Sequence, residues 1–189
     1  MLNIVLFGPP GAGKGTQAER IKDHYNLTHL STGDIFRKNI KSSTKLGLLA
    51  KSYIDKGELV PDEITIKMLQ AEVEKHTDSF GFIFDGFPRT KDQASALDEF
   101  LETLNTSINR MIALNVPEAE LINRLLARGR KSGRSDDQDE DIIANRIKVY
   151  EKKTAILADF YNDQNKLASI DGVGTVNEIT HRIYQVLDN

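Results

Sequence analysis

The sequence predicts an α/β fold, a three-layer sandwich in which a five-stranded parallel sheet carries helices on both faces. The first observation is that five short apolar runs alternate with stretches of helical periodicity, as expected when parallel strands are buried on both faces. The second is that the first run breaks into a glycine-rich loop that leads to a lysine and a helix. The predicted strands are residues 2–7, 27–30, 80–84, 111–116 and 167–170.

Composition indicates an ordinary globular chain forming a single domain over residues 1–189. A net charge of −3 argues against nonspecific nucleic-acid binding. The lack of cysteine excludes a disulfide framework and a cysteine-ligated zinc site. The first apolar run is too short for a membrane span and has no basic flank, so it is expected to be a strand and not a signal peptide. We therefore expect a cytoplasmic protein without a membrane partner.

The loop after the first strand matches most of the motif that cradles phosphates in nucleotide-binding proteins. Gly8, Gly13 and Lys14 have the required spacing, but Gly15 stands where a hydroxyl residue is usual, and Thr16 follows it. Backbone N–H groups at the start of the next helix would face an anion, and Lys14 adds a positive charge. The alternative is a glycine-rich turn with a surface lysine.

The second strand also leads into candidate binding residues. The segment 31–34 (STGD) is a helix-start signal, and Arg37 follows one turn later. Thr32 is a helix cap, a binding residue or both, and the alternative for Arg37 is a solvated helix arginine. Residues 45–56 carry a helical apolar stripe that ends at Gly57. The pattern alone predicts a helical hairpin.

An acidic residue, Asp85, ends the third predicted strand. The carboxyl ends of parallel strands share one edge of a sheet, so Asp85 is expected beside the glycine-rich loop. An acid at that place lies near the magnesium ion of a phosphate-binding loop. Because Gly15 offers no hydroxyl, we expect Mg²⁺ to be held through waters fixed by Asp34 and Asp85. The alternative is an exposed aspartate at a strand end.

Three motifs together resemble the adenylate kinases, a family of nucleoside monophosphate kinases. They are GPPGAGKGT at 8–16, STGD-x-x-R at 31–37 and DGFPR-T-x-x-Q at 85–93, and they occur in the family's order. The resemblance spans the whole chain and implies a P-loop NTPase-type fold and the reaction Mg·ATP + AMP ⇌ 2 ADP. It implies in-line transfer achieved by positioning and by charge neutralisation, with no general base.

The resemblance also implies an AMP site formed by two parts of the chain. Residues 31–60 are expected to form a small insert over the AMP base, which leaves 1–30, 61–126 and 138–189 as the core. Gln93 is expected to read the adenine edge, because an amide both donates and accepts. The implied AMP-binding residues are Thr32, Arg37, Glu58, Leu59, Val60, Gly86, Phe87, Pro88, Arg89, Gln93, Arg134 and Arg146.

Four arginines crowd into the segment 124–134, after a helix that is expected to start at Pro117. Arg124 and Arg128 share one helix face, and two glycines are expected to break the segment into a short mobile loop. The alternative is a solvated basic loop. By resemblance, residues 127–137 form a short lid, without the length or the cysteines of the larger, sometimes zinc-holding lids of other members.

A long helix is expected over about residues 140–162, with Ile142, Ile143, Ile147, Tyr150, Leu157, Ala158 and Tyr161 on one apolar stripe. Arg146 falls about 40° from Ile142 around this helix, inside the stripe. A charge there needs a partner, so Arg146 either forms a buried ion pair or reaches the phosphate site. The family assigns the matching arginine to the transferring phosphates.

The remaining expectations concern ATP and the chemistry. By resemblance, the Gly174 carbonyl receives the adenine amino group of ATP, and Arg128 stacks on or near that base. The implied ATP-binding residues are Gly11, Ala12, Gly13, Lys14, Gly15, Thr16, Arg128 and Gly174. The residues expected around the transferring phosphoryl group are Lys14, Arg89, Arg124, Arg134 and Arg146. We expect a monomer that binds ATP, AMP and ADP and whose two inserts close only when both nucleotides are bound. Its histidines, which show no ligand spacing, are expected at the surface.

Three other functions fit parts of the sequence. A pyrimidine monophosphate kinase shares nearly every motif, but Thr32 and Gln93 stand where such enzymes usually carry Ala and Asn. A GTPase switch needs a guanine-reading NKxD motif, and the segment 165–168 (NKLA) lacks its acid. A relative that only binds nucleotides would lack some of the expected arginines, and all of them are present here.

Overall fold

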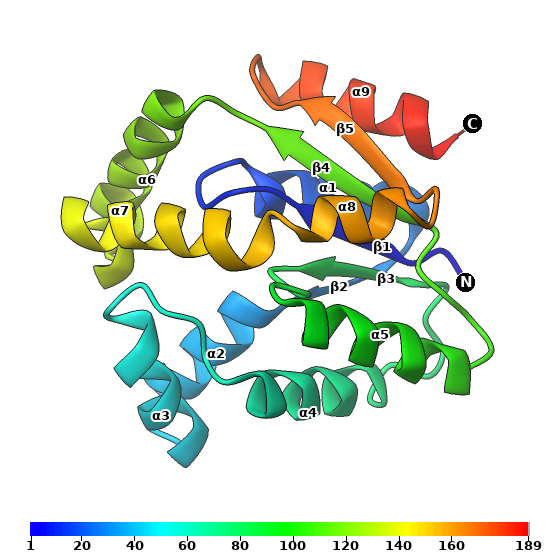
Figure 1. Ribbon diagram of the computed structural model, residues 1–189, viewed down its shortest axis with the longest axis horizontal. Helices are drawn as coiled ribbons and strands as arrows, with labels where there is room; N and C mark the ends of the chain where they lie inside the picture. The colour runs from blue at the N-terminus through cyan, green and yellow to red at the C-terminus, as the bar shows by residue number, and fades with distance from the viewer. Residues whose placement is uncertain (189) are drawn as a thin grey trace.

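The computed structural model describes residues 1–188, and it shows the predicted three-layer α/β sandwich (Figure 1). Five parallel strands lie in the order β2-β3-β1-β4-β5. The strands are β1 (Ile4–Phe7), β2 (Thr28–Ser31), β3 (Phe82–Asp85), β4 (Arg110–Asn115) and β5 (Leu167–Asp171). The helices are α1 (Lys14–Tyr25), α2 (Thr32–Lys41), α3 (Lys45–Ile54), α4 (Asp62–Val73), α5 (Lys91–Thr103), α6 (Glu118–Ser132), η1 (Ser135–Asp137), α7 (Glu140–Val149), η2 (Tyr150–Thr154), α8 (Leu157–Asn162) and α9 (Val176–Leu187).

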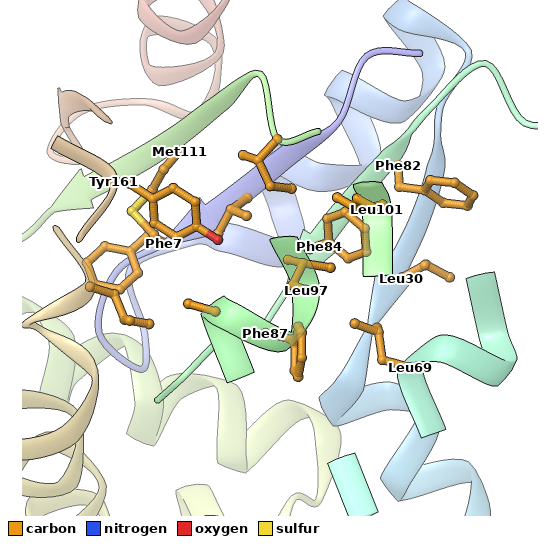
Figure 2. Packing of buried hydrophobic residues seen from close by; sticks show 14 of the residues in the cluster. Phe7, Leu30, Leu69, Phe82, Phe84, Phe87, Leu97, Leu101, Met111 and Tyr161 are labelled. Atoms are coloured by element: carbon orange, nitrogen blue, oxygen red, sulfur yellow. The ribbon is translucent and has the colours of Figure 1, made fainter. Parts of the chain in front are cut away.

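Successive residues of β1 supply the two sides of the core, because side chains alternate across a strand. Val5 and Phe7 pack in one cluster with residues of α4, α5 and α8, and Figure 2 shows this cluster. Ile4 and Leu6 pack on the opposite face with residues of α1, α6 and α9. All four side chains are at most 5% exposed, so the prediction of a strand buried on both faces is confirmed.

Strand pairing places the glycine-rich loop and the end of β3 at the same edge. Leu6 of β1 is in register with Asp85 of β3, and Ser31 of β2 pairs with the same residue from the other side. The loops that follow these three strands therefore leave the sheet together. This is the edge at which open parallel sheets bind their ligands.

The third strand begins later than predicted. It starts at Phe82, while Phe80 is 68% exposed and lies outside the sheet. Between them, Gly81 has a φ of +156°, and a Cβ on it would collide with the backbone of Leu2. The apolar run therefore includes a close backbone approach that only glycine permits.

The long helix expected over residues 140–162 is interrupted. A π-helical turn, η2, separates α7 from α8, with the N–H of Ala155 donating to the carbonyl of Tyr150. Inside this turn the buried Thr154 hydroxyl donates to the carbonyl oxygen of Arg89, at 2.8 Å. Such turns insert one extra residue into a helix and are frequent at functional sites. Periodicity alone gives no sign of this insertion.

The predicted loop at residues 127–137 was wrong for its first half. Helix α6 continues to Ser132, and Gly133 in the left-handed conformation ends it. Gly129 does not break the helix, because its role is steric: a Cβ there would collide with the backbone carbonyl of Asp137. The lack of a side chain lets η1 lie directly against α6.

The segment 31–60 forms the predicted helical hairpin from α2 and α3. Phe36, Ala50 and Val60 form a small core of its own, separate from the two clusters that cover the sheet. Figure 1 shows this hairpin and the α6–α7 region projecting from the sheet on the same side. Across residues 1–188, no helix has the length and apolar character needed to cross a membrane.

Candidate active site

A cleft of about 670 Å³ opens at the carboxyl ends of β1, β2 and β3. Its wall is formed by the glycine-rich loop, the start of α2, the segment 57–60, the loop after β3 and the arginines of α6, α7 and the lid segment. Nearly all of the predicted site residues therefore meet in one place. Three do not line it: Ala12 and Phe87 are buried in the two main clusters, and Gly174 lies outside the lining.

The glycine-rich loop wraps around the ammonium group of Lys14. Its Nζ donates to the carbonyl oxygens of Gly8 at 2.7 Å and Pro9 at 3.0 Å. Burial lowers the pKa of Lys14 to about 7; the negative charge of Asp85 opposes this shift, and the charge of Arg89 adds to it. The loop thus holds a buried cation that gains from any anion placed beside it.

His29 is not a surface residue as predicted, because its side chain is only 10% exposed. It lies between two carboxylates, with Nε2 at 3.4 Å from Asp85 and Nδ1 at 3.0 Å from Glu19. Burial alone would raise the pKa of Asp85, but the hydrogen bond with His29 and the charge of Lys14 outweigh it and lower that pKa. Asp85 is therefore ionised at neutral pH, at the edge of the cleft.

Asp34, the second residue expected near magnesium, is the counter-ion of nearby arginines. It forms an ion pair with Arg37 at 2.6 Å and lies 3.6 Å from Arg134. Within residues 1–188, no group of three His, Cys, Asp or Glu side chains could enclose a metal ion. Asp34 and Asp85 both line the cleft.

The loop after β3 fixes Arg89 through neutral backbone groups. Arg89 Nε donates to the carbonyl of Gly86 at 2.8 Å, and the Thr32 hydroxyl donates to the same oxygen at 2.9 Å. Burial, together with the neighbouring charge of Arg146, lowers the pKa of Arg89 to about 10. The guanidinium remains charged at neutral pH.

Gln93, expected to read the adenine base, has a residue exposure of 2% and lines the cleft. Its Oε1 accepts from the backbone N–H of Arg89 at 2.8 Å. Its Nε2 donates to Asp62 at 2.8 Å, and the Thr90 hydroxyl donates to the other oxygen of that carboxylate at 2.7 Å. The amide is therefore held at both ends.

Two arginines near the lid share a buried carboxylate. Arg128 pairs with both oxygens of Asp137, at 2.6 and 2.9 Å, and Arg146 pairs with Asp137 at 2.6 Å and with Asp136 at 2.9 Å. The Asp137 side chain is fully buried, and Arg128 lowers its pKa against the effect of burial. The buried ion pair that the position of Arg146 predicted is present, and Arg146 also lines the cleft.

Arg124 and Arg128 face different parts of the cleft. Arg124 donates to Glu120 at 2.8 Å and to the carbonyl of Gly172 at 3.2 Å, beside the loop that contains Gly174. Arg128 instead holds the carboxylate of Asp137, and its positive charge helps to lower the pKa of Lys14. Arg124 is therefore tied to the loop after β5, whereas Arg128 is tied to η1.

The insert 31–60 touches both the lid segment 127–137 and the neighbouring α7. The Ser135 hydroxyl donates to Asp55 at 3.3 Å, and Asn145 Nδ2 donates to the carbonyl of Lys56 at 2.7 Å. Gly57 lies so close to α7 that a Cβ on it would approach Arg146 Cγ to 2.9 Å. The hairpin and the lid region thus bound the same cavity.

Comparison with known proteins agrees with this geometry. A sequence model described as adenylate kinase matches residues 6–166. The chain belongs to the adenylate kinase family. It is 58% identical over 189 residues to the adenylate kinase of Flavobacterium johnsoniae and 57% identical to that of Flavobacterium psychrophilum, each match covering 100% of both chains. It is 50% identical to the adenylate kinase of Parabacteroides distasonis, over 100% of this chain and 99% of that protein.

Motif reasoning misses three residues that contact cleft side chains in this adenylate kinase family member. His29 carries no ligand spacing, Asp62 reads as an ordinary acid in the first turn of a helix, and Asp137 reads as part of a solvated loop. For Asp137 a signal exists: Arg146 lies inside an apolar stripe and needs a buried acid nearby. For His29 and Asp62 the partners are distant in sequence, so only the fold reveals them.

Proposed function

We propose that this chain catalyses the reversible transfer of the terminal phosphoryl group of Mg·ATP to AMP, giving two ADP. The observation that carries the proposal is that Lys14, Arg89, Arg128 and Arg146 all line one cleft, where the three arginines are close enough to Lys14 to lower its pKa. Bringing two polyanions together costs repulsion that such a cluster offsets. Membership of the adenylate kinase family supports the same reaction.

Positioning and charge neutralisation account for the chemistry. The loop at 8–16 and Lys14 bind the β- and γ-phosphates of ATP, and Arg89 binds the phosphate of AMP. The AMP phosphate is already ionised, so it attacks in line without a general base. Arg134 and Arg146 complete the ring of donors around the transferring group.

The contacts favour exchanging two of the roles expected from sequence. Arg128, which was expected on the ATP base, is the one of the two whose charge lowers the pKa of Lys14, so we place it on the phosphates. Arg124, which was expected on the phosphates, stands beside the loop at 172–174 and is better placed for the ATP base. Gly174 keeps its proposed backbone contact with adenine, at the end of that loop.

The acids at the cleft edge suit Mg²⁺, a hard cation that keeps several waters and prefers oxygen ligands. The ionised carboxylate of Asp85 lies beside Gly15 and Lys14, where it would hold the ion through water. Asp34 stays a candidate for the same task, although Arg37 and Arg134 compete for it. When bound, the ion neutralises charge on the transferring phosphates.

The two inserts serve the two nucleotides. Residues 31–60 cover AMP, whose base meets Gln93 and the backbone at 58–60, and residues 127–137 cover the phosphates. Their closure excludes water, which would otherwise accept the phosphoryl group. We expect full closure only with both nucleotides, in a cytoplasmic monomer. Fluorescence distances between the inserts that do not change with a two-substrate analogue would contradict this.

The first test is ADP production from Mg·ATP with AMP, UMP, CMP or GMP offered separately. Strong turnover with AMP alone is expected. A preference for UMP or CMP would keep the phosphoryl transfer and overturn the adenine assignment of Thr32 and Gln93. Tight ATP binding without turnover on any acceptor would favour a binding protein instead.

A further inference from the structure

The side-chain amide of Gln93 has neighbours that leave it one orientation. An amide presents an acceptor oxygen and a donor NH₂ of nearly the same shape, so only its partners can distinguish the two ends. The backbone N–H of Arg89, which points to Oε1 at 2.8 Å, can only donate. The carboxylate of Asp62, at 2.8 Å from Nε2, can only accept when ionised. Turning the amide over would place two donors together and two acceptors together.

Asp62 is itself fixed from a second direction. Its other oxygen accepts from the Thr90 hydroxyl at 2.7 Å, and that hydroxyl also accepts from the backbone N–H of Gln93 at 3.2 Å as the cap of α5. The carboxylate therefore joins the first residue of α4 to the first turn of α5. It is a rigid partner for the amide.

The groups left over on Gln93 determine what a base can offer it. After Asp62 and Arg89 are satisfied, one N–H of Nε2 and one lone pair of Oε1 remain at a residue that lines the cleft. They form a donor and an acceptor in a fixed order. A 6-aminopurine presents an amino donor next to the N1 acceptor, and a 6-oxopurine presents the reverse order.

We propose that Asp62 is a positioning residue that fixes the Gln93 amide, so that the acceptor site prefers a 6-aminopurine nucleotide to a 6-oxopurine nucleotide. This rests on the proposed function, in which Gln93 faces the base of the acceptor. Asp62 acts through Gln93 without touching the nucleotide. Selectivity for the base is thus set by a side chain outside the base pocket.

The decisive variant is Asp62→Ala, assayed with AMP and with inosine monophosphate, its 6-oxo analogue. Without Asp62 only the backbone N–H of Arg89 still orients the amide, so the turned-over form becomes accessible and the preference for AMP in kcat/KM is expected to fall by about tenfold or more. The KM for AMP is expected to rise, while the KM for ATP stays within about twofold, because Asp62 lies on the acceptor side.

Glu63→Ala is the matched control. Glu63 is the next acid in the same first turn of α4 and is exposed, so its removal changes the helix charge without touching Gln93. Its preference for AMP should stay that of the parent. Asp62→Asn keeps one oxygen that can accept from Gln93, so its preference for AMP in kcat/KM should fall by only about threefold. This variant also provides a test if the alanine variant does not fold.

A double-mutant cycle separates positioning from mere support of the fold. In a Gln93→Ala background, Asp62→Ala should change the AMP preference by less than about twofold, because the amide through which it acts is gone. An equally large effect in that background would overturn the proposal. So would an unchanged preference in both folded Asp62 variants.

Calorimetric binding of AMP and inosine monophosphate separates this inference from the proposed reaction. If the parent protein makes no ADP but binds AMP in preference, and Asp62→Ala removes that preference, the reaction fails and the inference stands. If the parent makes ADP and its AMP preference does not depend on Asp62, the inference fails and the reaction stands.

Discussion

The cations of the cleft form two groups that are held in different ways. Lys14 and Arg89, which stand next to the sheet, donate to backbone carbonyl oxygens and form no ion pair within residues 1–188. Arg128 and Arg134, which lie in the lid segment 127–137, and Arg146, which lies on the neighbouring α7, each pair with a carboxylate. The first group is compensated by neutral dipoles and the second by full negative charges.

This difference distinguishes cations that are already positioned for a phosphate from arginines that must change partner when a phosphate binds. A carbonyl oxygen orients a cation without cancelling its charge, so Arg89 always presents a positive charge to a phosphate, and Lys14 does so whenever it is protonated. An arginine of the lid has to share or exchange its carboxylate when a phosphate arrives. The acids near the lid therefore stabilise a segment whose own charges repel one another, while leaving it able to respond to a nucleotide.

The largest effect is expected next to the sheet. Arg89→Ala removes a cation that no neighbour can replace, so kcat/KM for AMP should fall by roughly 10³-fold. Arg130→Ala is the control: Arg130 is exposed in the last turn of α6 and should stay within about twofold of the parent. Steady-state kinetics measure both variants. Full turnover of the Arg89→Ala variant would show that Arg89 is not a cation on which the reaction depends.

In the lid segment, the main effect of a substitution is expected on the free energy of unfolding. Asp137→Ala leaves Arg128 without its buried partner and Arg146 with Asp136 alone, which is expected to lower the free energy of unfolding by about 3 kcal/mol. Urea unfolding measures this change. Asp141→Ala removes an exposed acid from the first turn of α7 and should cost less than about 0.5 kcal/mol. Equal effects of the two variants would mean that Asp137 is not what holds the lid arginines.

A third comparison tests the exchanged roles of two arginines on one helix. Arg128→Ala should lower kcat by roughly 10²-fold, because a phosphate-facing donor acts in the transition state. Arg124→Ala should mainly raise the KM for ATP and leave kcat within a few fold. Each variant is the other's control, and the opposite split would restore the assignment that the sequence alone suggested.

The smallest expected effect is the uptake of a proton when nucleotide binds. Because burial lowers the pKa of Lys14 to about 7, the free protein at pH 8 carries this lysine mostly neutral, and a bound polyphosphate raises its pKa again. Binding of an ATP analogue should therefore take up a fraction of one proton at pH 8 and almost none at pH 6. Calorimetry in buffers of different ionisation enthalpy measures this, with Lys14→Met as the control. No uptake at pH 8 would mean that Lys14 stays charged without an anion.

The sequence predicted those parts of the molecule that depend on neighbours along the chain. Apolar runs placed the strands, and the glycine loop and strand-end Asp85 defined one edge of the sheet. Those features follow from local periodicity and from the rule that parallel strands end together. The hairpin at 31–60 followed from its own apolar stripe.

What the sequence could not supply were contacts made across the fold. Asp62 contacts Gln93 although the two are 31 positions apart in sequence, and His29 contacts Asp85 although they are 56 positions apart. Gly129 looked like a helix breaker because nothing local shows that another backbone lies against it. Arg146 is the intermediate case: its position in the stripe predicted a partner without identifying Asp137.

The π-helical turn η2 determines how the number of residues at 150–154 affects the orientation of α7. A π turn uses one residue more than an α turn for nearly the same rotation, so the extra residue in 150–154 leaves the phase of the flanking helices almost unchanged. The same residue inserted into a regular α-helix would turn α7 by about 100° relative to α8 and carry Arg146 away from the cleft. The π turn therefore lets the chain hold an extra residue here while Arg146 stays at the cleft and Thr154 reaches the carbonyl oxygen of Arg89.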